Sequence, residues 1–209
     1  MARRYVWLII VGLMLLGIVA VICVLQMARV ALSPGQESPQ AVLQKAQRAF
    51  IAGDKTGFLD CLAVRSDHYK AAAEAAFDCA LAAHNLRLAL TERYGKNAWE
   101  TFLSLQADAA QFSAFDWLGG DDFVSTAAIE AKGDEARVQL PAPHEALGLR
   151  REGVWRIELF PRGSGVREKR ESLVRAAEAL SKARERIGQA GATPESLARE
   201  VRKQIAGER

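Results

Sequence analysis

The residues best suited to chemistry gather in one short stretch, "DWLGGDD", which spans residues 116–122. It places the carboxylates of Asp116, Asp121 and Asp122 and the indole of Trp117 around two glycines. Carboxylates bind cations or act as general bases, and functional loops present such groups at a surface. We therefore name these four as candidate ligand-binding residues. The competing interpretation is an ordinary loop, because the ordered ligand spacing of a calcium loop is missing.

A second combination pairs a thiol with an imidazole, since His84 follows Cys79 by five residues within a helical pattern. Neighbours on one helix face lie three or four residues apart, so this spacing argues against a nucleophile and base in contact. His68 and His144 have no second ligand at the spacing of known metal motifs. We therefore predict no catalytic residue, no metal site and no cofactor.

Two cysteines, Cys61 and Cys79, leave two interpretations open. In an oxidising compartment they could form a disulfide, provided that their Cα atoms lie within about 7 Å. Unequal distances from the expected turn near Ser66 place them at different heights on neighbouring helices. The other interpretation is two small, buried thiols.

The N-terminus provides the strongest signal of location. Residues 5–28 form a run of 24 residues without an ionisable charge, between Arg4 and Arg29. As a helix this run spans about 36 Å, which is enough to cross the hydrocarbon core of a bilayer. A cleaved signal peptide, cut near Ala31, is the alternative, but its apolar region is normally about 7–15 residues long. We therefore expect an uncleaved transmembrane anchor that contacts the lipid bilayer.

Flanking charges predict the orientation of this anchor. Arg3 and Arg4 precede the span, and only Arg29 follows closely behind it. Positive residues prefer the cytoplasmic side, so residues 1–4 form a cytoplasmic stub and the rest of the chain lies outside. In a cell with two membranes of the Gram-negative type, that compartment is the periplasm.

Helical patterns follow a linker, residues 29–38, which is rich in Pro, Gly and Ser. Ser38 and Pro39 are typical of a helix start, and "AGD" at residues 52–54 interrupts the first helix. Ala-rich apolar spacing predicts a long helix over residues 67–94, and a further helix from Trp99 to about Phe112.

The apolar period then changes from helical to two, which predicts an antiparallel meander. The expected strands are residues 124–131, a second strand through "EARVQL", a third beginning at Leu147, and a fourth through "VWRIEL". Leu147, Leu149, Trp155 and Ile157 share the face that the upstream helices must cover. Residues 39–161 therefore form an α+β domain, with helices packed on one curved sheet.

The combination of "RAFIAGDKTGFLDCL", a long second helix and "GDEARVQL…LGLRREGVWRIELF" resembles the nuclear transport factor 2-like superfamily of cone-shaped α+β domains. In particular it is similar to membrane-anchored bacterial members of unknown function. The resemblance covers residues 39–161. It implies a cone-shaped domain. Some members of the superfamily are enzymes that use an Asp or His inside the cone, and many others bind a ligand or have a structural role. The resemblance assigns no catalytic residue here, because no position matches a catalytic motif.

A charged helical tail, residues 162–209, completes the chain. It holds 12 Lys and Arg against 7 Asp and Glu, about +5 in a chain whose net charge is +3. Leu173, Leu180 and Ile187 recur every seven residues and form a narrow apolar seam. One interpretation is a helical hairpin folded on its own domain. The other is an arm that binds a protein partner or a membrane surface through these three residues.

Two classes of function follow. The first is a non-enzymatic, membrane-tethered module that binds a protein or a small ligand, and the sequence favours it. The alternative is a small hydrolase, isomerase or cyclase-like enzyme with an acid in a pocket. Nucleic acid is not an expected partner, because Glu residues interrupt the basic tail and the tail lies outside the cytoplasm in this topology. Nothing in the sequence names a ligand, a partner or an oligomeric state.

Overall fold

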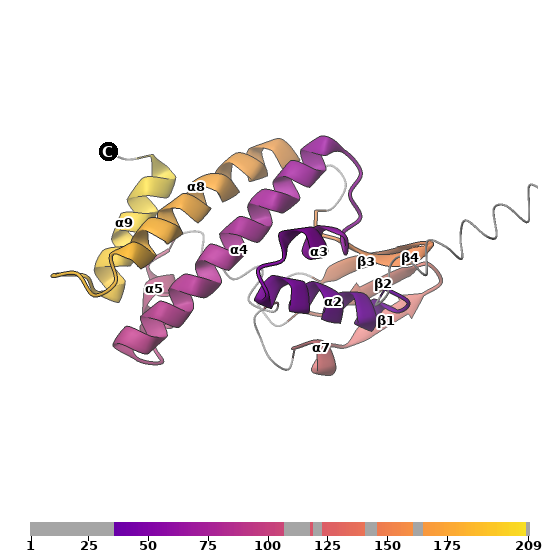
Figure 1. Ribbon diagram of the computed structural model, residues 1–209, viewed down its shortest axis with the longest axis horizontal. Helices are drawn as coiled ribbons and strands as arrows, with labels where there is room; N and C mark the ends of the chain where they lie inside the picture. Colours follow the sequence, from indigo (N-terminus) through magenta and orange to yellow (C-terminus); the bar gives the residue numbers. More distant parts are fainter. Residues whose placement is uncertain (1–35, 107–117, 119–122, 141–145, 161–164, 208–209) are drawn as a thin grey trace, which may run out of the picture.

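A computed structural model describes residues 36–106, 118, 123–140, 146–160 and 165–207. The described chain is an α+β fold with a four-stranded antiparallel sheet (Figure 1). The predicted anchor, residues 5–28, and residues 29–35 of the linker lie outside the described residues. Within the described part of the chain, no helix has both the length and the apolar character needed to cross a membrane.

Two short helices open the folded part, and the first begins at the predicted place. Helix α2 spans Pro39–Ile51, and the Ser38 hydroxyl accepts a hydrogen bond from the Ala41 amide at 3.1 Å. Helix α3 spans Lys55–Leu59 and is capped by Asp54. These caps satisfy amide groups that have no partner inside the helix, so the polar residues before each helix fix where it begins.

The longest helix, α4, spans Asp67–Tyr94 as predicted, and α8 spans Val166–Glu185. The two run side by side in the same direction (Figure 1). Near their first turns, the Phe160 amide donates to the Tyr69 hydroxyl at 3.1 Å. Near their last turns, the Tyr94 hydroxyl donates to the Ala192 carbonyl at 2.8 Å.

Small side chains allow this pair of helices to approach closely. The buried alanines are Ala72, Ala76, Ala80 and Ala83 on α4 and Ala176, Ala179 and Ala183 on α8. Because the separation of packed helices depends on the side chains at their contact, two alanine-rich faces form a tight interface. The contact between α4 and α8 is the most extensive one in the described fold.

Two shorter helices meet at the far end of this pair. Helix α5 spans Ala98–Ser104, and α9 spans Pro194–Ala206 with Thr193 as its cap. The buried Gln106 side chain donates to the Ala198 carbonyl at 2.8 Å and joins the two. The predicted helix to Phe112 therefore ends earlier, at Ser104, and residues 107–112 lie outside the described chain.

The sheet is a meander in the order β1-β2-β3-β4, as predicted. Its strands are β1 Ile129–Lys132, β2 Glu135–Val138, β3 Leu147–Glu152 and β4 Val154–Glu158. Gly133 lies in the turn between β1 and β2 with φ of +63°, and Gly153 lies in the turn between β3 and β4 with φ of +80°. Residues with a side chain rarely adopt these left-handed backbone angles, so both turns require glycine.

One predicted strand is wrong in its first half. Residues 123–126 form a short helix, α7, and β1 begins only at Ile129. Val124 is buried in the hydrophobic core, which shows that tertiary packing prevailed over the β-propensity of this stretch. The predicted inner face is confirmed, since Leu147, Leu149, Trp155 and Ile157 are all buried.

A single hydrophobic core joins the sheet, α2 and the helices of the tail. It includes Phe50 and Leu43 of α2, Ile157 of β4, and Leu180 and Val201 of the tail. The helical hairpin is therefore folded on its own domain, one of the two interpretations that the sequence left open. Residues 165–207 are part of the same folded unit as the described residues between 36 and 160.

Candidate functional site

The most distinctive local structure is the junction at which the chain enters the folded unit. Gln36 is 1% exposed, although it lies within the predicted linker, residues 29–38. Its backbone carbonyl accepts a hydrogen bond from the Trp155 amide at 3.0 Å, and its side-chain amide donates to the Asp60 carbonyl at 2.7 Å. These contacts fix the entry point of the chain against the outer edge of β4.

Residues 61–63 cover the rest of that edge. The Ile157 amide donates to the Cys61 carbonyl at 2.8 Å, and the Ala63 amide donates to the Ile157 carbonyl at 2.9 Å. Leu62 thereby forms a parallel bridge with Ile157. Together with Gln36, this segment pairs the outward-facing amides of Trp155 and Ile157, so the β4 edge is closed.

The side chain of Arg156 in β4 also binds the segment that covers this edge. The Arg156 guanidinium donates to the Asp60 carbonyl at 3.0 Å and to the Leu62 carbonyl at 3.3 Å. Glu158 lies on the same face of β4 as Arg156 and forms an ion pair with Arg65. Both side chains of this pair are about one-third exposed. A partly exposed pair contributes little stability, so these residues mainly orient the segment.

The outer face of the sheet is polar and carries charges of both signs. One row across the strands contains Lys132, Glu135, Arg150 and Arg156, and the next contains Glu130, Arg137, Gly148 and Glu158. Opposite charges lie opposite each other at Lys132 and Glu135 and again at Glu130 and Arg137. We call these eight residues the outer sheet face. A surface of this kind offers polar contacts and no enclosed reaction site.

The cysteines do not form a nucleophilic site. Cys61 and Cys79 are both buried and free, so the disulfide interpretation is wrong for this structure. Burial raises the pKa of the Cys61 thiol to about 11 and that of the Cys79 thiol to about 12. Because the thiolate is the reactive form, both sulfurs are inert at neutral pH.

Two histidines can be placed in the described chain. The half-buried His84 packs against the ring of Phe50 with a centroid separation of 5.8 Å, and His68 is exposed at the start of α4. His144 lies outside the described residues. Among the residues that the structure describes, no three His, Cys, Asp or Glu side chains come together as a metal site.

The seven site residues predicted from sequence separate into two groups. Asp116, Trp117, Asp121 and Asp122 lie outside the described residues. Leu173 and Leu180 are 8% and 0% exposed in the core, and Ile187 packs partly buried against it. The apolar seam of the tail is therefore an internal contact, and Leu173 and Leu180 are not accessible to a partner. This corrects their assignment as partner-contact residues.

A small surface cleft lies between α4 and α8, with a volume of about 250 Å³. Its lining residues are Ala82, Asn85, Ser181, Arg184 and Glu185. Most of these groups belong to solvated helix surfaces, and the cleft brings together no pair of carboxylates. It has the character of a groove between two helices rather than a reaction site.

Sequence reasoning missed the junction because no local pattern indicates it. Gln36 stands in a stretch without apolar periodicity, and its partners Asp60 and Trp155 are 24 and 119 positions further along the chain. The one available signal was the position of Gln36, just before the Ser38-Pro39 helix start. A comparison of the chain with protein-family models, curated proteins and solved structures found no match. Functional inference therefore rests on the geometry.

Proposed function

We propose that this chain is a single-pass membrane protein whose folded unit is a non-catalytic, extracytoplasmic interaction module. Residues 5–28 are the anchor, residues 1–4 lie in the cytoplasm, and residues 36–209 lie on the opposite side of the membrane. In a cell of the Gram-negative type this places the folded unit in the periplasm. The fold is α+β, as the resemblance to the nuclear transport factor 2-like superfamily implied, and membership of that superfamily is part of the proposal.

The observation that carries this proposal is the junction at Gln36. Only residues 29–35 separate the end of the apolar run from the buried Gln36. Seven residues span at most about 25 Å when fully extended. The folded unit is therefore held close to the membrane surface, which suits a module that presents a fixed surface to a neighbour.

The inner sheet face favours a binding role over an enzymatic one. An enzyme that uses a pocket acid needs an ionisable side chain on the face that the helices cover. In the described strands, the middle of that face carries Ala131, Ala136, Leu149 and Ile157. The charged groups instead occupy the outer sheet face, where solvent and partners reach them.

A topology experiment tests the proposal. A reporter that is active only outside the cytoplasm, fused after Arg209, should be active, and the fusion should remain with membranes after a high-salt wash. Protease added to cells with an opened outer envelope should then digest the folded unit. An inactive reporter would refute the proposed orientation, and release of a shorter soluble protein would show cleavage near Ala31 and refute the anchor.

A further inference from the structure

The sheet has a second edge, along β1, and within the described residues no backbone group pairs with it. The Gln139 amide donates to the Ala128 carbonyl at 3.0 Å, so the backbone of residue 128 faces β2. Successive residues of a paired strand alternate in direction, so Glu130 and Lys132 also face β2. The amides and carbonyls of Ile129 and Ala131 therefore point outward from the sheet.

The side chains of β1 leave this edge accessible. Glu130, Ala131 and Lys132 are exposed, and Ile129 is half-buried. The strand contains no proline that would remove an outward amide. Edge strands with free amides and carbonyls are templates for another extended chain, and natural proteins usually protect them. Here the charges of the edge decide which chain fits.

Among the registers centred on the three exposed residues of β1, one antiparallel register suits a second copy of the same strand. The outward-facing residues must lie opposite each other, so the two-fold axis must pass through a residue of β1. An axis at Glu130 brings two glutamates together, and an axis at Lys132 brings two lysines together. An axis at Ala131 places Glu130 opposite Lys132 of the second copy, and the same contact repeats by symmetry.

We propose that two copies of this chain pair through β1 about a two-fold axis at Ala131. In this register Ala131 exchanges two backbone hydrogen bonds with Ala131 of the second copy, and Ile129 lies opposite Gly133. The two four-stranded sheets become one continuous sheet. This inference goes beyond the proposed function and does not depend on the orientation in the membrane.

Several features of the molecule favour a second copy over a different chain. The β4 edge is closed by Gln36 and residues 61–63, so only β1 can extend the sheet, and pairing stops at two copies. Alternation of one negative and one positive side chain makes the strand complementary to itself. Four-residue strands form a small interface, so we expect a weak dimer that confinement of tethered chains to one surface strengthens.

Cysteine cross-linking of the full-length chain tests the register. In a hydrogen-bonded antiparallel pair the Cα atoms lie about 5.5 Å apart, which a disulfide can bridge. Ala131→Cys should therefore give a covalent dimer when membranes isolated from the cells are treated with copper phenanthroline, whichever side of the membrane the sheet lies on. Cys23→Ala serves as the background, because the two other cysteines are buried. The matched control is Asp134→Cys in the same hairpin, whose two copies would lie roughly 20 Å apart.

Charge reversal tests the pairing of Glu130 with Lys132. In the Ala131→Cys chain, either Glu130→Lys or Lys132→Glu should lower the cross-linked fraction about tenfold at low salt, because each creates two like-charge contacts. The double reversal, Glu130→Lys with Lys132→Glu, should restore it. Co-production of the two single variants should also restore it, as a mixed dimer. All three substitutions lie on exposed positions, so loss of folding does not explain a loss of cross-linking.

The outcomes separate the possible occupants of the edge. Cross-linking at Ala131→Cys that exceeds the Asp134→Cys control and follows the charge pattern supports the dimer. Equal cross-linking at the two positions, or a double reversal that fails to restore it, overturns the proposal. Ala131→Cys adducts that contain a different protein and no dimer would also overturn it, and would show that the edge accepts another chain.

Discussion

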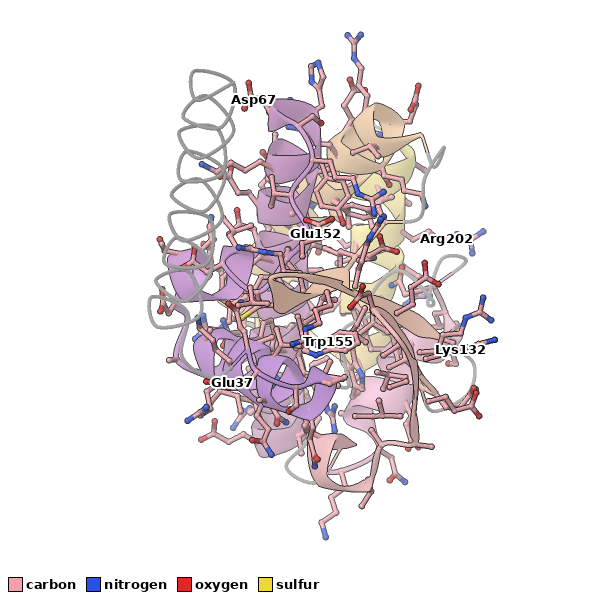
Figure 2. The ribbon with its side chains drawn as sticks, turned by 90° about the vertical axis from the view of Figure 1, so that its right-hand side faces the viewer. Glu37, Asp67, Lys132, Glu152, Trp155 and Arg202 are labelled. Atoms are coloured by element: carbon pink, nitrogen blue, oxygen red, sulfur yellow. The ribbon has the colours of Figure 1, made fainter. Side chains whose placement is uncertain are left out.

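The two edges of the sheet differ in how the chain treats them. At the β4 edge, Gln36 and residues 61–63 pair the outward amides of Trp155 and Ile157. At the β1 edge, the backbone of Ile129 and Ala131 points outward, and no described residue pairs with it. Figure 2 views this end of the molecule and places Glu37, beside the closed edge, and Lys132, beside the open one, on opposite sides of Trp155.

The difference shows how one sheet serves two purposes. The closed edge holds the segment just before α2, because Gln36 is a buried partner of β4 and precedes the Ser38 cap by two residues. The open edge is a local hairpin with exposed charges of opposite sign. One edge therefore pairs with the segments at Gln36 and residues 61–63, whereas the backbone of the other pairs with no residue in the described part of the chain.

The largest expected effect on stability comes from removing a buried side chain of β4, the strand at the closed edge. Trp155→Ala should lower the free energy of unfolding by roughly 3–5 kcal/mol, the usual cost of truncating a buried tryptophan. Urea unfolding of a fragment that begins at residue 30 measures it. Lys132→Ala at the open edge is the matched control and should change stability by less than about 0.5 kcal/mol. Equal effects at the two edges would contradict the difference in burial.

A substitution in the helical tail gives a loss of stability with which the effects at the two edges can be compared. Leu180→Ala should cost roughly 2–5 kcal/mol, because Leu180 of α8 is fully buried in the hydrophobic core. Val174→Ala on the same helix should cost far less, since Val174 is 39% exposed. The same urea titration compares them. A Leu180→Ala variant as stable as the parent chain would mean that the tail is a free arm rather than part of the core.

A smaller change at the junction sharpens the comparison. Gln36→Ala removes the hydrogen bond to the Asp60 carbonyl and should cost about 1 kcal/mol, the usual net value of such a bond. The exposed Gln44 of α2 provides the control, and Gln44→Ala should have almost no effect. If the two variants unfold at the same urea concentration, the side chain of Gln36 does not contribute to the closed edge.

The contribution of the two buried thiols to the free energy of unfolding should be constant near neutral pH and should change only in alkali. In the folded chain, burial raises the pKa of Cys61 to about 11 and of Cys79 to about 12, whereas an unfolded thiol ionises near 9.0. The contribution of the two thiols to stability is therefore complete below pH 9 and declines as pH rises from 9 toward 12. Urea midpoints between pH 7 and 11 measure this. Replacing both cysteines by alanine should reduce the alkaline decline, and an unchanged decline would assign it to other groups.

The sequence predicted the elements that local patterns encode. Alternation in β3 and β4 identified Leu149, Trp155 and Ile157 as buried, and the Ser38 cap located a helix start. Apolar spacing in the tail identified Leu173 and Leu180 as one apolar face. It could not say what that face contacts, because α4 is apolar around much of its surface and matches many partners.

Long-range pairing was not predictable from the sequence. Leu62 bridges Ile157 across 95 positions, and a short segment in that place has no strand pattern of its own. The helix at residues 123–126 was missed for a related reason, since a four-residue element depends more on its packing than on its propensities. The candidate residues Asp116, Trp117, Asp121 and Asp122 remain a prediction.

Native-state hydrogen exchange tests the difference between the two edges most directly. We use the Glu130→Lys chain, in which charge repulsion prevents the proposed β1 pairing. Our account predicts that the Trp155 and Ile157 amides, which donate at 3.0 and 2.8 Å, exchange only through global unfolding. The Ala131 amide, which points outward, should exchange nearly as fast as in an unstructured peptide. Fast exchange at Trp155 and Ile157, or strong protection at Ala131 in this variant, would contradict the account.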